Sequence, residues 1–251
     1  MDRDFASDLE VARGLRVFFA HQSVGFNILA GVEQVSASKG QPLKVIALDQ
    51  TDTQTGPAWL QSPAGKNGEP KTKVDFFVQT LTREPHLKAD LALMKFCYVD
   101  FTPETDVADL FAYYQKSIQA LERARPDVRI AHATVPLKEK PHGLKSFARR
   151  TLGQELPGDA ANVKRAEFNQ RLLQAFASEP IFDVARIEST RPDGSRETFD
   201  HHGQTYYSLN PGYSSDGGHL NDLGQRVLGA EMIHFVARST KPPTSLAGTH
   251  P

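Results

Sequence analysis

Short apolar runs alternate with longer segments of helical periodicity along most of the chain. Runs rich in β-branched and aromatic residues are typical of strands buried on both faces. We expect such strands at residues 15–20, 43–48, 90–99, 128–135 and 181–185. Apolar residues spaced three or four positions apart predict helices between them. These helices are expected at residues 24–38, 74–81, 105–124, 162–177 and 222–238.

The regular alternation of strands and helices predicts an α/β fold. Its parallel sheet of about five strands would be covered by helices on both faces, as a three-layer α/β/α sandwich. The chain has 251 residues, an ordinary size for one α/β domain. We therefore expect a single domain over residues 1–238. The Pro-, Ser- and Thr-containing segment 239–251 is expected to be a disordered tail.

Three long polar segments interrupt this alternation, at residues 49–73, 137–161 and 186–215. We interpret all three as loops, with Trp59 as an anchor of the first. Structureless loops of this length are uncommon in compact domains unless they have a function. Because they follow strands, we expect them near the carboxyl edge of the sheet, where open α/β sheets bind ligands.

Composition and charge narrow the classes of function. The chain has 29 Lys and Arg against 30 Asp and Glu, for a formal net charge of -1, which argues against a nucleic-acid partner. No apolar run approaches the roughly 18 residues needed to span a membrane. The start MDRDFASDLE lacks the basic and apolar regions of a signal peptide, so a cytoplasmic location is the default expectation, and export would require a leader that precedes it.

Ser23 is the first candidate for chemistry. It lies in LRVFFAHQSVGFN (15–27), between the first predicted strand and the first predicted helix. Backbone N–H groups at a helix start lack partners and favour negative charge, so an oxygen nucleophile is well placed there. Position alone also fits the helix N-cap, where serine is common.

The second candidate is the segment SSDGGHLNDLG (214–224), before the last predicted helix. It places Asp216 and His219 three residues apart in a Gly-rich turn. A carboxylate that holds one imidazole nitrogen leaves the other free to face a hydroxyl group, as in a Ser-His-Asp triad. Alone, this pair also fits a turn-capping aspartate beside a surface histidine.

Taken together, HQSVG and DGGHLN resemble the first and last sequence blocks of the SGNH (GDSL-type) hydrolases. The resemblance extends from the first strand to the final helix, with specific motifs at its two ends. It implies a flavodoxin-like sheet and esterase activity without a cofactor or metal. It also implies that Ser23 is the nucleophile, His219 the base and Asp216 the carboxylate that orients this base.

The middle of the chain departs from that family's pattern. The family uses a glycine N–H of its second block and the asparagine of a G-x-N-D block as donors to the oxyanion. Here CYVD (97–100) places Asp100 at the aspartate and Val99 at the asparagine. The segment AGKNGEP (64–70) offers Gly65 and Asn67 as donors beside the N–H of Ser23, although a plain Asn-Gly turn is the alternative.

The expected substrate is a small-molecule or carbohydrate ester, with a sugar O-acetyl ester favoured because the loops carry aromatic residues and lack a broad apolar lip. Tyr206 and Tyr207 are available for stacking on a sugar. The candidate substrate contacts are His21, Trp59, Asp100 and Tyr213.

Other residues and functions stay open beside this hypothesis. The same serine could serve an O-acyltransferase, and a chain without the oxyanion asparagine could be a non-catalytic carbohydrate-binding protein. A metal-dependent hydrolase would use Asp200, His201, His202 and His219, although adjacent ligands rarely converge without a spaced partner. We expect His132 to be a buried structural histidine and the single Cys97 to be a packing residue. The basic cluster is interpreted as a solvated face, with an anionic substrate as the alternative: Lys138, Lys140, Lys145, Arg149 and Arg150.

Overall fold

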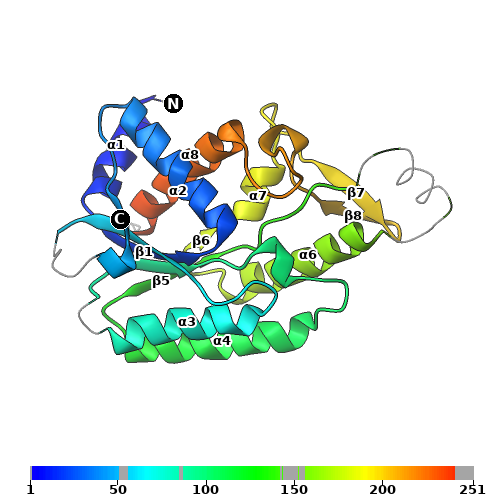
Figure 1. Ribbon diagram of the computed structural model, residues 1–251, viewed down its shortest axis with the longest axis horizontal. Helices are drawn as coiled ribbons and strands as arrows, with labels where there is room; N and C mark the ends of the chain where they lie inside the picture. The colour runs from blue at the N-terminus through cyan, green and yellow to red at the C-terminus, as the bar shows by residue number, and fades with distance from the viewer. Residues whose placement is uncertain are drawn as a thin grey trace, which may run out of the picture.

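A parallel sheet forms the middle layer of the computed structural model (Figure 1). The structure describes residues 2–50, 56–84, 87–141, 143, 152 and 156–240. The six strands have the order β2-β3-β1-β4-β5-β6, and each neighbouring pair is parallel. In that order they are Val45–Ala47, Ala58–Pro63, Arg16–His21, Leu91–Met94, Arg129–Ala133 and Ile181–Phe182. The predicted α/β/α sandwich is confirmed.

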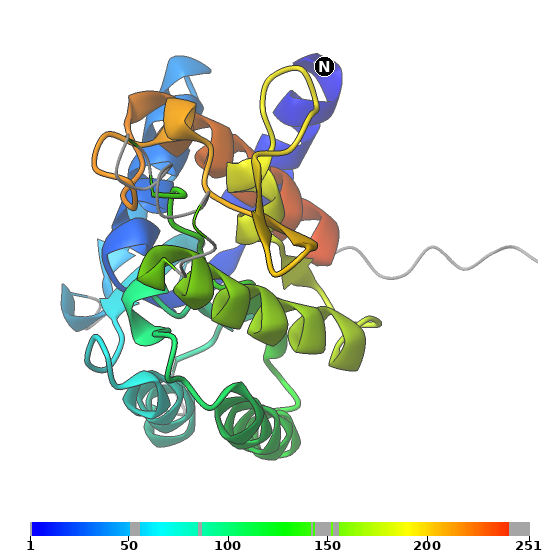
Figure 2. The same ribbon diagram turned by 90° about the vertical axis from the view of Figure 1, so that its right-hand side faces the viewer.

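Helices cover both faces of the sheet (Figures 1 and 2). One layer contains α1 (Asp2–Arg13), α2 (Ser23–Ser38), α7 (Val184–Ser189) and α8 (Asp222–Ser239). The other contains α3 (Pro70–Arg83), α4 (Val107–Ala124) and α6 (Pro157–Ala175). Successive side chains of a strand point to opposite faces of the sheet. Phe18 packs in the core under α3 and α4, whereas Phe19 packs under α2 and α8. The described helices include none that is both long and apolar enough to cross a bilayer.

Helices α2 and α8, from opposite ends of the chain, touch through two glycines. A Cβ atom on Gly31 would lie 1.8 Å from the carbonyl oxygen of Gln225, and one on Gly229 would lie 2.3 Å from the carbonyl carbon of Gly31. Only residues without a side chain allow this approach. The contact therefore fixes the start of α8, and the turn before it, against α2.

The first predicted loop was wrong, because residues 49–73 contain a central strand. Strand β3 lies between β2 and β1, and α3 begins within the same segment at Pro70, a residue well suited to a first helical position. Only Trp59 and Leu60 signalled the strand. The indole N–H of Trp59 donates to the carbonyl oxygen of Ala12 at 3.1 Å, so contacts far along the chain stabilise a strand that its own pattern hides.

Other elements differ in extent from the predictions. The strand expected at 90–99 ends at Met94, and its last residues form the 3-10 helix η2 (Tyr98–Asp100). Within 186–215 the structure has α7, the antiparallel hairpin of β7 (Thr198–His201) and β8 (Gln204–Tyr207), and the 3-10 helix η3 (Pro211–Tyr213). Helix α8 reaches Ser239, and the rest of the predicted tail beyond residue 240 lies outside the described residues, as do Lys145, Arg149 and Arg150.

Candidate active site

Ser23 is the first residue of α2, directly after the carboxyl end of the central strand β1. Gln22 is the N-cap residue, and its side chain makes no capping bond to the helix. The N-cap interpretation of Ser23 was therefore wrong. The first N–H groups of a helix have no partner within it, so Ser23 stands where the backbone can receive a developing negative charge.

The Gln22 side chain instead holds the loop that follows β3. Its Nε2 donates to the carbonyl oxygens of Ala64 at 2.9 Å and Gly65 at 3.0 Å. The N–H of Ala64 donates to the carbonyl of His21 at 2.7 Å. Gly65 has a φ of 51°, and a Cβ there would lie 2.6 Å from the backbone nitrogen of Lys73, so this position requires glycine. These bonds place the predicted oxyanion loop beside Ser23.

A buried ion pair orients Asn67 in this loop. Lys73 Nζ donates to Asp100 Oδ2 at 2.6 Å and to Asn67 Oδ1 at 2.8 Å, and both side chains of the ion pair are fully buried. Asp100 also accepts from the N–H groups of Gly68 at 2.9 Å and Cys97 at 2.6 Å. A lysine ammonium has only donors, so the Asn67 atom that faces Lys73 is its oxygen Oδ1. The amide nitrogen Nδ2 of Asn67 therefore points away from Lys73, and the residue is exposed.

Asp216 and His219 form the predicted pair. Asp216 Oδ2 accepts from His219 Nδ1 at 2.6 Å, and Oδ1 accepts from the N–H groups of Gly218 at 2.9 Å and His219 at 2.7 Å. The hydrogen bond with the imidazole, followed by those with the backbone, lowers the pKa of Asp216 to about 2. The carboxylate is thus ionised at neutral pH and bonds to Nδ1, so Nε2 is the His219 nitrogen that does not bond to Asp216.

Asn27 joins this turn to the helix that begins at Ser23. The N–H of Leu220 donates to Asn27 Oδ1 at 3.2 Å. Asn27 is four residues after Ser23, so both lie on one face of α2. The structure therefore brings Ser23, Asp216 and His219 to one end of the sheet. Within the described chain, His219 Nε2 makes its hydrogen bond with Tyr98 Oη at 3.3 Å and none with Ser23.

The four predicted substrate contacts are side chains of the interior. His21, Trp59, Asp100 and Tyr213 are each at most 4% exposed. The His21 ring packs between Phe19 and Phe26 and beneath Gly25, where a Cβ would lie 2.2 Å from the ring. Trp59 and Asp100 make the internal bonds described above. Their burial argues against direct contact with a substrate, and their role at the site stays a prediction.

Two buried basic residues near the site were not predicted from the sequence. Arg165, on α6, is 3% exposed and donates to the carbonyl oxygens of Tyr98 and Phe101. Burial lowers its pKa to about 10. Lys95, at the end of β4, is fully buried and donates to the carbonyl of Phe96 at 2.9 Å. The sequence offered one signal, which was the position of Lys95 inside an apolar run. A lysine is rarely buried there unless its charge has a partner.

Burial controls the charge of two histidines. It lowers the pKa of His21 and of His132 to about 4 each. His21 Nδ1 donates to the carbonyl of Gln22 at 2.9 Å, while its Nε2 has no partner. His132 is fully buried between Tyr114 Oη at 2.8 Å and Glu179 Oε2 at 2.7 Å, which confirms the prediction of a structural histidine. Cys97 is likewise buried.

The low pKa of His21 predicts a loss of stability in acid. An unfolded histidine has a pKa near 6.5 and binds its proton first, so the stabilisation is complete above pH ~6.5 and is lost as the pH falls toward 4. His21→Asn keeps a donor for the Gln22 carbonyl and cannot titrate in this range. We expect denaturant unfolding between pH 6.5 and 4 to show a shallower slope for this variant, by up to about 1.4 kcal/mol per pH unit. Identical slopes would contradict this assignment.

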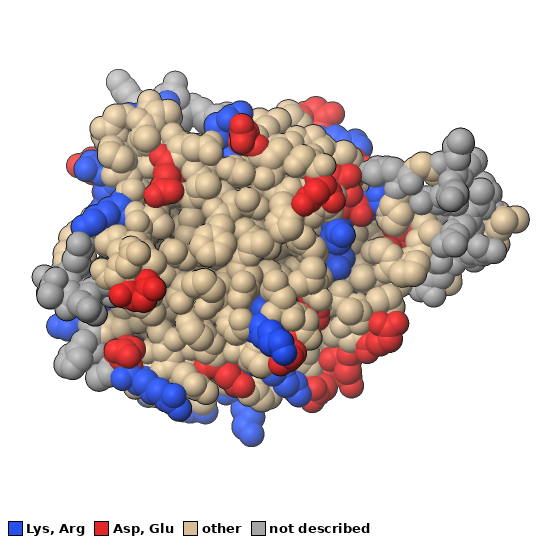
Figure 3. All heavy atoms as spheres, viewed as in Figure 1, with Lys and Arg blue, Asp and Glu red and all other residues tan. Residues whose placement is uncertain are grey.

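The predicted metal-binding residues do not converge. In the part of the chain that the structure describes, the potential ligand atoms that lie within 4.8 Å of one another belong to Glu122, His132 and Glu179. Asp200, His201, His202 and His219 form no such group there. Figure 3 shows acidic and basic side chains interspersed on the visible face, in keeping with the near-neutral net charge.

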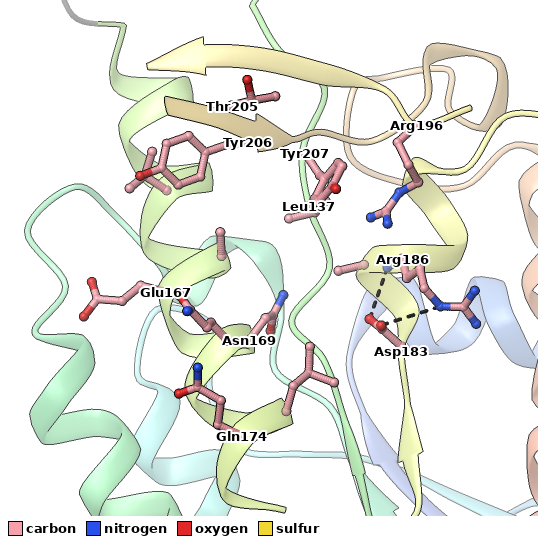
Figure 4. Close-up of a pocket in the computed structure, with 15 residues that line it drawn as sticks. Leu137, Glu167, Asn169, Gln174, Asp183, Arg186, Arg196, Thr205, Tyr206 and Tyr207 are labelled. Atoms are coloured by element: carbon pink, nitrogen blue, oxygen red, sulfur yellow. Dashed lines mark hydrogen bonds and ion pairs between the residues drawn. The ribbon is translucent and has the colours of Figure 1, made fainter. Parts of the chain in front are cut away.

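A cavity of about 700 Å³ lies apart from Ser23, between α6, α7 and the β7–β8 hairpin (Figure 4). Tyr206 and Tyr207 line it together with Arg186 and Arg196. Neither Ser23, Asp216 nor His219 is among the residues around it. The two tyrosines predicted to stack on a sugar therefore face a separate hollow.

Comparisons with known proteins support the fold. No protein-family model and no curated protein matches the chain. It is similar to the solved structures of a lipase/acylhydrolase from Enterococcus faecalis (14% identity, TM-score 0.52, 91% of this chain and 98% of that one) and a peptidoglycan O-acetylesterase (11%, 0.54, 94% and 96%). An acetyl xylan esterase is similar as well (14%, 0.50, 87% and 98%). The chain therefore has the fold of the SGNH (GDSL-type) hydrolases.

Proposed function

We propose that the chain is a serine hydrolase that cleaves carboxylic esters through Ser23, His219 and Asp216. The observation that carries this proposal is the 2.6 Å bond between Asp216 and His219, in a turn that is hydrogen-bonded to α2 one helical turn after Ser23. This arrangement supports a nucleophile, a base and a group that orients the base at the carboxyl edge of the sheet, where α/β folds place their ligands.

Acylation would begin with proton transfer from Ser23 to His219. Because Asp216 accepts the Nδ1 proton, Nε2 carries the lone pair that can remove the proton from Ser23 Oγ as this oxygen attacks the acyl carbon. The imidazolium then donates that proton to the oxygen of the leaving alcohol as the ester C–O bond breaks. Water, deprotonated by the same Nε2, releases the acid from the acyl-enzyme and restores Ser23.

Three donors would stabilise the oxyanion: the N–H of Ser23, the N–H of Gly65 and the Nδ2 group of Asn67. The helix start supplies the first donor, and the Gln22 side chain fixes the loop that carries the second. Lys73 holds the oxygen of Asn67 and so presents its amide nitrogen. Donors fixed in place before the reaction need no reorganisation when the charge develops, which is their main contribution to rate.

An O-acetyl ester of a carbohydrate is the proposed substrate class. Support comes from the fold, which is shared with an acetyl xylan esterase and a peptidoglycan O-acetylesterase. The exposed loop at Gly65–Gly68 is polar, and this suits a hydroxylated alcohol better than a lipid.

Covalent trapping tests the proposed nucleophile. The purified protein would be treated with diisopropyl fluorophosphate and assayed for hydrolysis of p-nitrophenyl acetate and acetylated xylo-oligosaccharides. We expect activity to fall in proportion to the formation of a single adduct, which mass spectrometry would map to Ser23. Without the inhibitor, we expect EDTA to leave the activity unchanged. An adduct elsewhere with full activity would refute the serine mechanism. Loss of activity in EDTA would favour a metal hydrolase, and binding of the oligosaccharides without hydrolysis would favour a binding protein.

A further inference from the structure

The hydroxyl group of Tyr98 is hydrogen-bonded to His219 Nε2, the nitrogen that acts as the base in the proposed reaction. Tyr98 Oη is 3.3 Å from His219 Nε2, and the two rings meet edge to face with their centroids 5.7 Å apart. Gly218 makes room for this approach, since a Cβ there would lie 2.7 Å from the tyrosine ring. The contact is thus built into the Gly-rich turn.

Neighbouring elements hold Tyr98 in this place. Arg165 Nε and Nη2 donate to its carbonyl oxygen at 3.0 and 2.8 Å, and Lys138 Nζ lies 5.4 Å from the centre of its ring. The residue is 7% exposed. Burial, and then the charge of Asp216, raise the pKa of the Tyr98 hydroxyl, so it is a neutral hydrogen-bond donor at physiological pH.

The leaving alcohol must come to the same nitrogen. Its oxygen receives the proton from His219 Nε2, which requires an approach to hydrogen-bond distance. Before substrate binds, the Tyr98 hydroxyl donates to Nε2. In the proposed reaction, Ser23 Oγ replaces the Tyr98 hydroxyl as the donor to His219 Nε2. The Tyr98 hydroxyl then has lost its acceptor and lies beside the position of the leaving oxygen.

We propose that Tyr98 is a catalytic residue that donates a hydrogen bond to the leaving-group oxygen of the ester. This inference rests on the proposed function. As the C–O bond breaks, its electron pair stays on the alcohol oxygen and the proton of His219 Nε2 passes to that oxygen. Tyr98 keeps its own proton and stabilises the developing alkoxide. Poor leaving groups gain most from such a donor, because they develop the most basic oxygen.

Tyr98→Phe tests this role, because it removes the hydroxyl and keeps the ring. We would measure kcat/KM, which reports the steps through acylation, for ethyl acetate and for p-nitrophenyl acetate. The expected loss is on the order of 10–100-fold with ethyl acetate and less than about 3-fold with p-nitrophenyl acetate. Tyr113→Phe is the matched control, because its hydroxyl bonds to Asp75 between α3 and α4. We expect that variant to hydrolyse both esters like the wild type.

Each result separates this inference from the proposed function. An equal loss with both esters would indicate a structural role of the hydroxyl and overturn the inference, as would no loss with either ester. In both cases, activity that depends on Ser23 would leave the proposed function intact. Hydrolysis that survives Ser23→Ala would overturn the proposed function and the role of Tyr98 together. Support for the inference also requires that Tyr113→Phe has the wild-type ratio of kcat/KM for the two esters.

Discussion

Ser23→Ala is expected to lower kcat for p-nitrophenyl acetate by at least about 10⁴-fold, because it removes the proposed nucleophile. Ser23 is partly exposed at the start of α2 and caps nothing. Its replacement should therefore change the free energy of unfolding by no more than about 0.5 kcal/mol. Initial rates, together with thermal unfolding followed by circular dichroism, measure both effects.

Ser38→Ala is the matched control for that variant. Ser38 ends the same helix, is exposed, and donates to the carbonyl of Val35 at 2.7 Å. We expect wild-type activity from it. His219→Ala should lose about as much activity as Ser23→Ala, and the double variant little more, because the two residues act as a unit. Retained activity in Ser23→Ala, or additive losses in the double variant, would contradict the proposed triad.

The sequence predicted those parts of the fold whose signals are local. The apolar runs of β1 and β4 and the periodic apolar face of α4 marked these elements clearly. Strand β3 was missed because its residues are mostly polar or small and only two of them are large and apolar. It takes its place through pairing with β1 and β2 and through the bond from Trp59 to Ala12, 47 residues away. Such contacts leave no pattern in the segment itself.

The same distinction applies to the candidate site. Asp216 and His219 are three residues apart, so a local motif was enough to predict their bond. Tyr98 and His219 are 121 residues apart, and nothing in CYVD signals that its tyrosine turns toward the histidine. Burial was equally hard to predict from the sequence, because Trp59 and Tyr213 stand in segments with polar neighbours and yet pack in the interior.

The second large effect is expected at Asn67, where a contact with Lys73 supports one role of the side chain over the other. Asn67→Ala should lower kcat by roughly 10²–10³-fold with little change in KM, as for the loss of one oxyanion donor. Sequence alone allowed either a donor or a plain Asn-Gly turn. The bond from Lys73 Nζ to Asn67 Oδ1 at 2.8 Å favours the donor, because it leaves the amide nitrogen free to face the reacting carbonyl. Steady-state kinetics with p-nitrophenyl acetate measures both constants.

Asn67→Asp separates the donor from the loop anchor. An aspartate has nearly the same shape and keeps an oxygen for Lys73, so the loop contacts with Asp100 and Lys73 should persist. It offers no donor at neutral pH, and it adds negative charge where the oxyanion forms. We therefore expect a loss in kcat at least as large as that of Asn67→Ala, with unfolding unchanged. Near wild-type kcat in Asn67→Asp, with a loss confined to Asn67→Ala, would mean that Asn67 only anchors the loop and that the N–H groups of Ser23 and Gly65 alone receive the oxyanion.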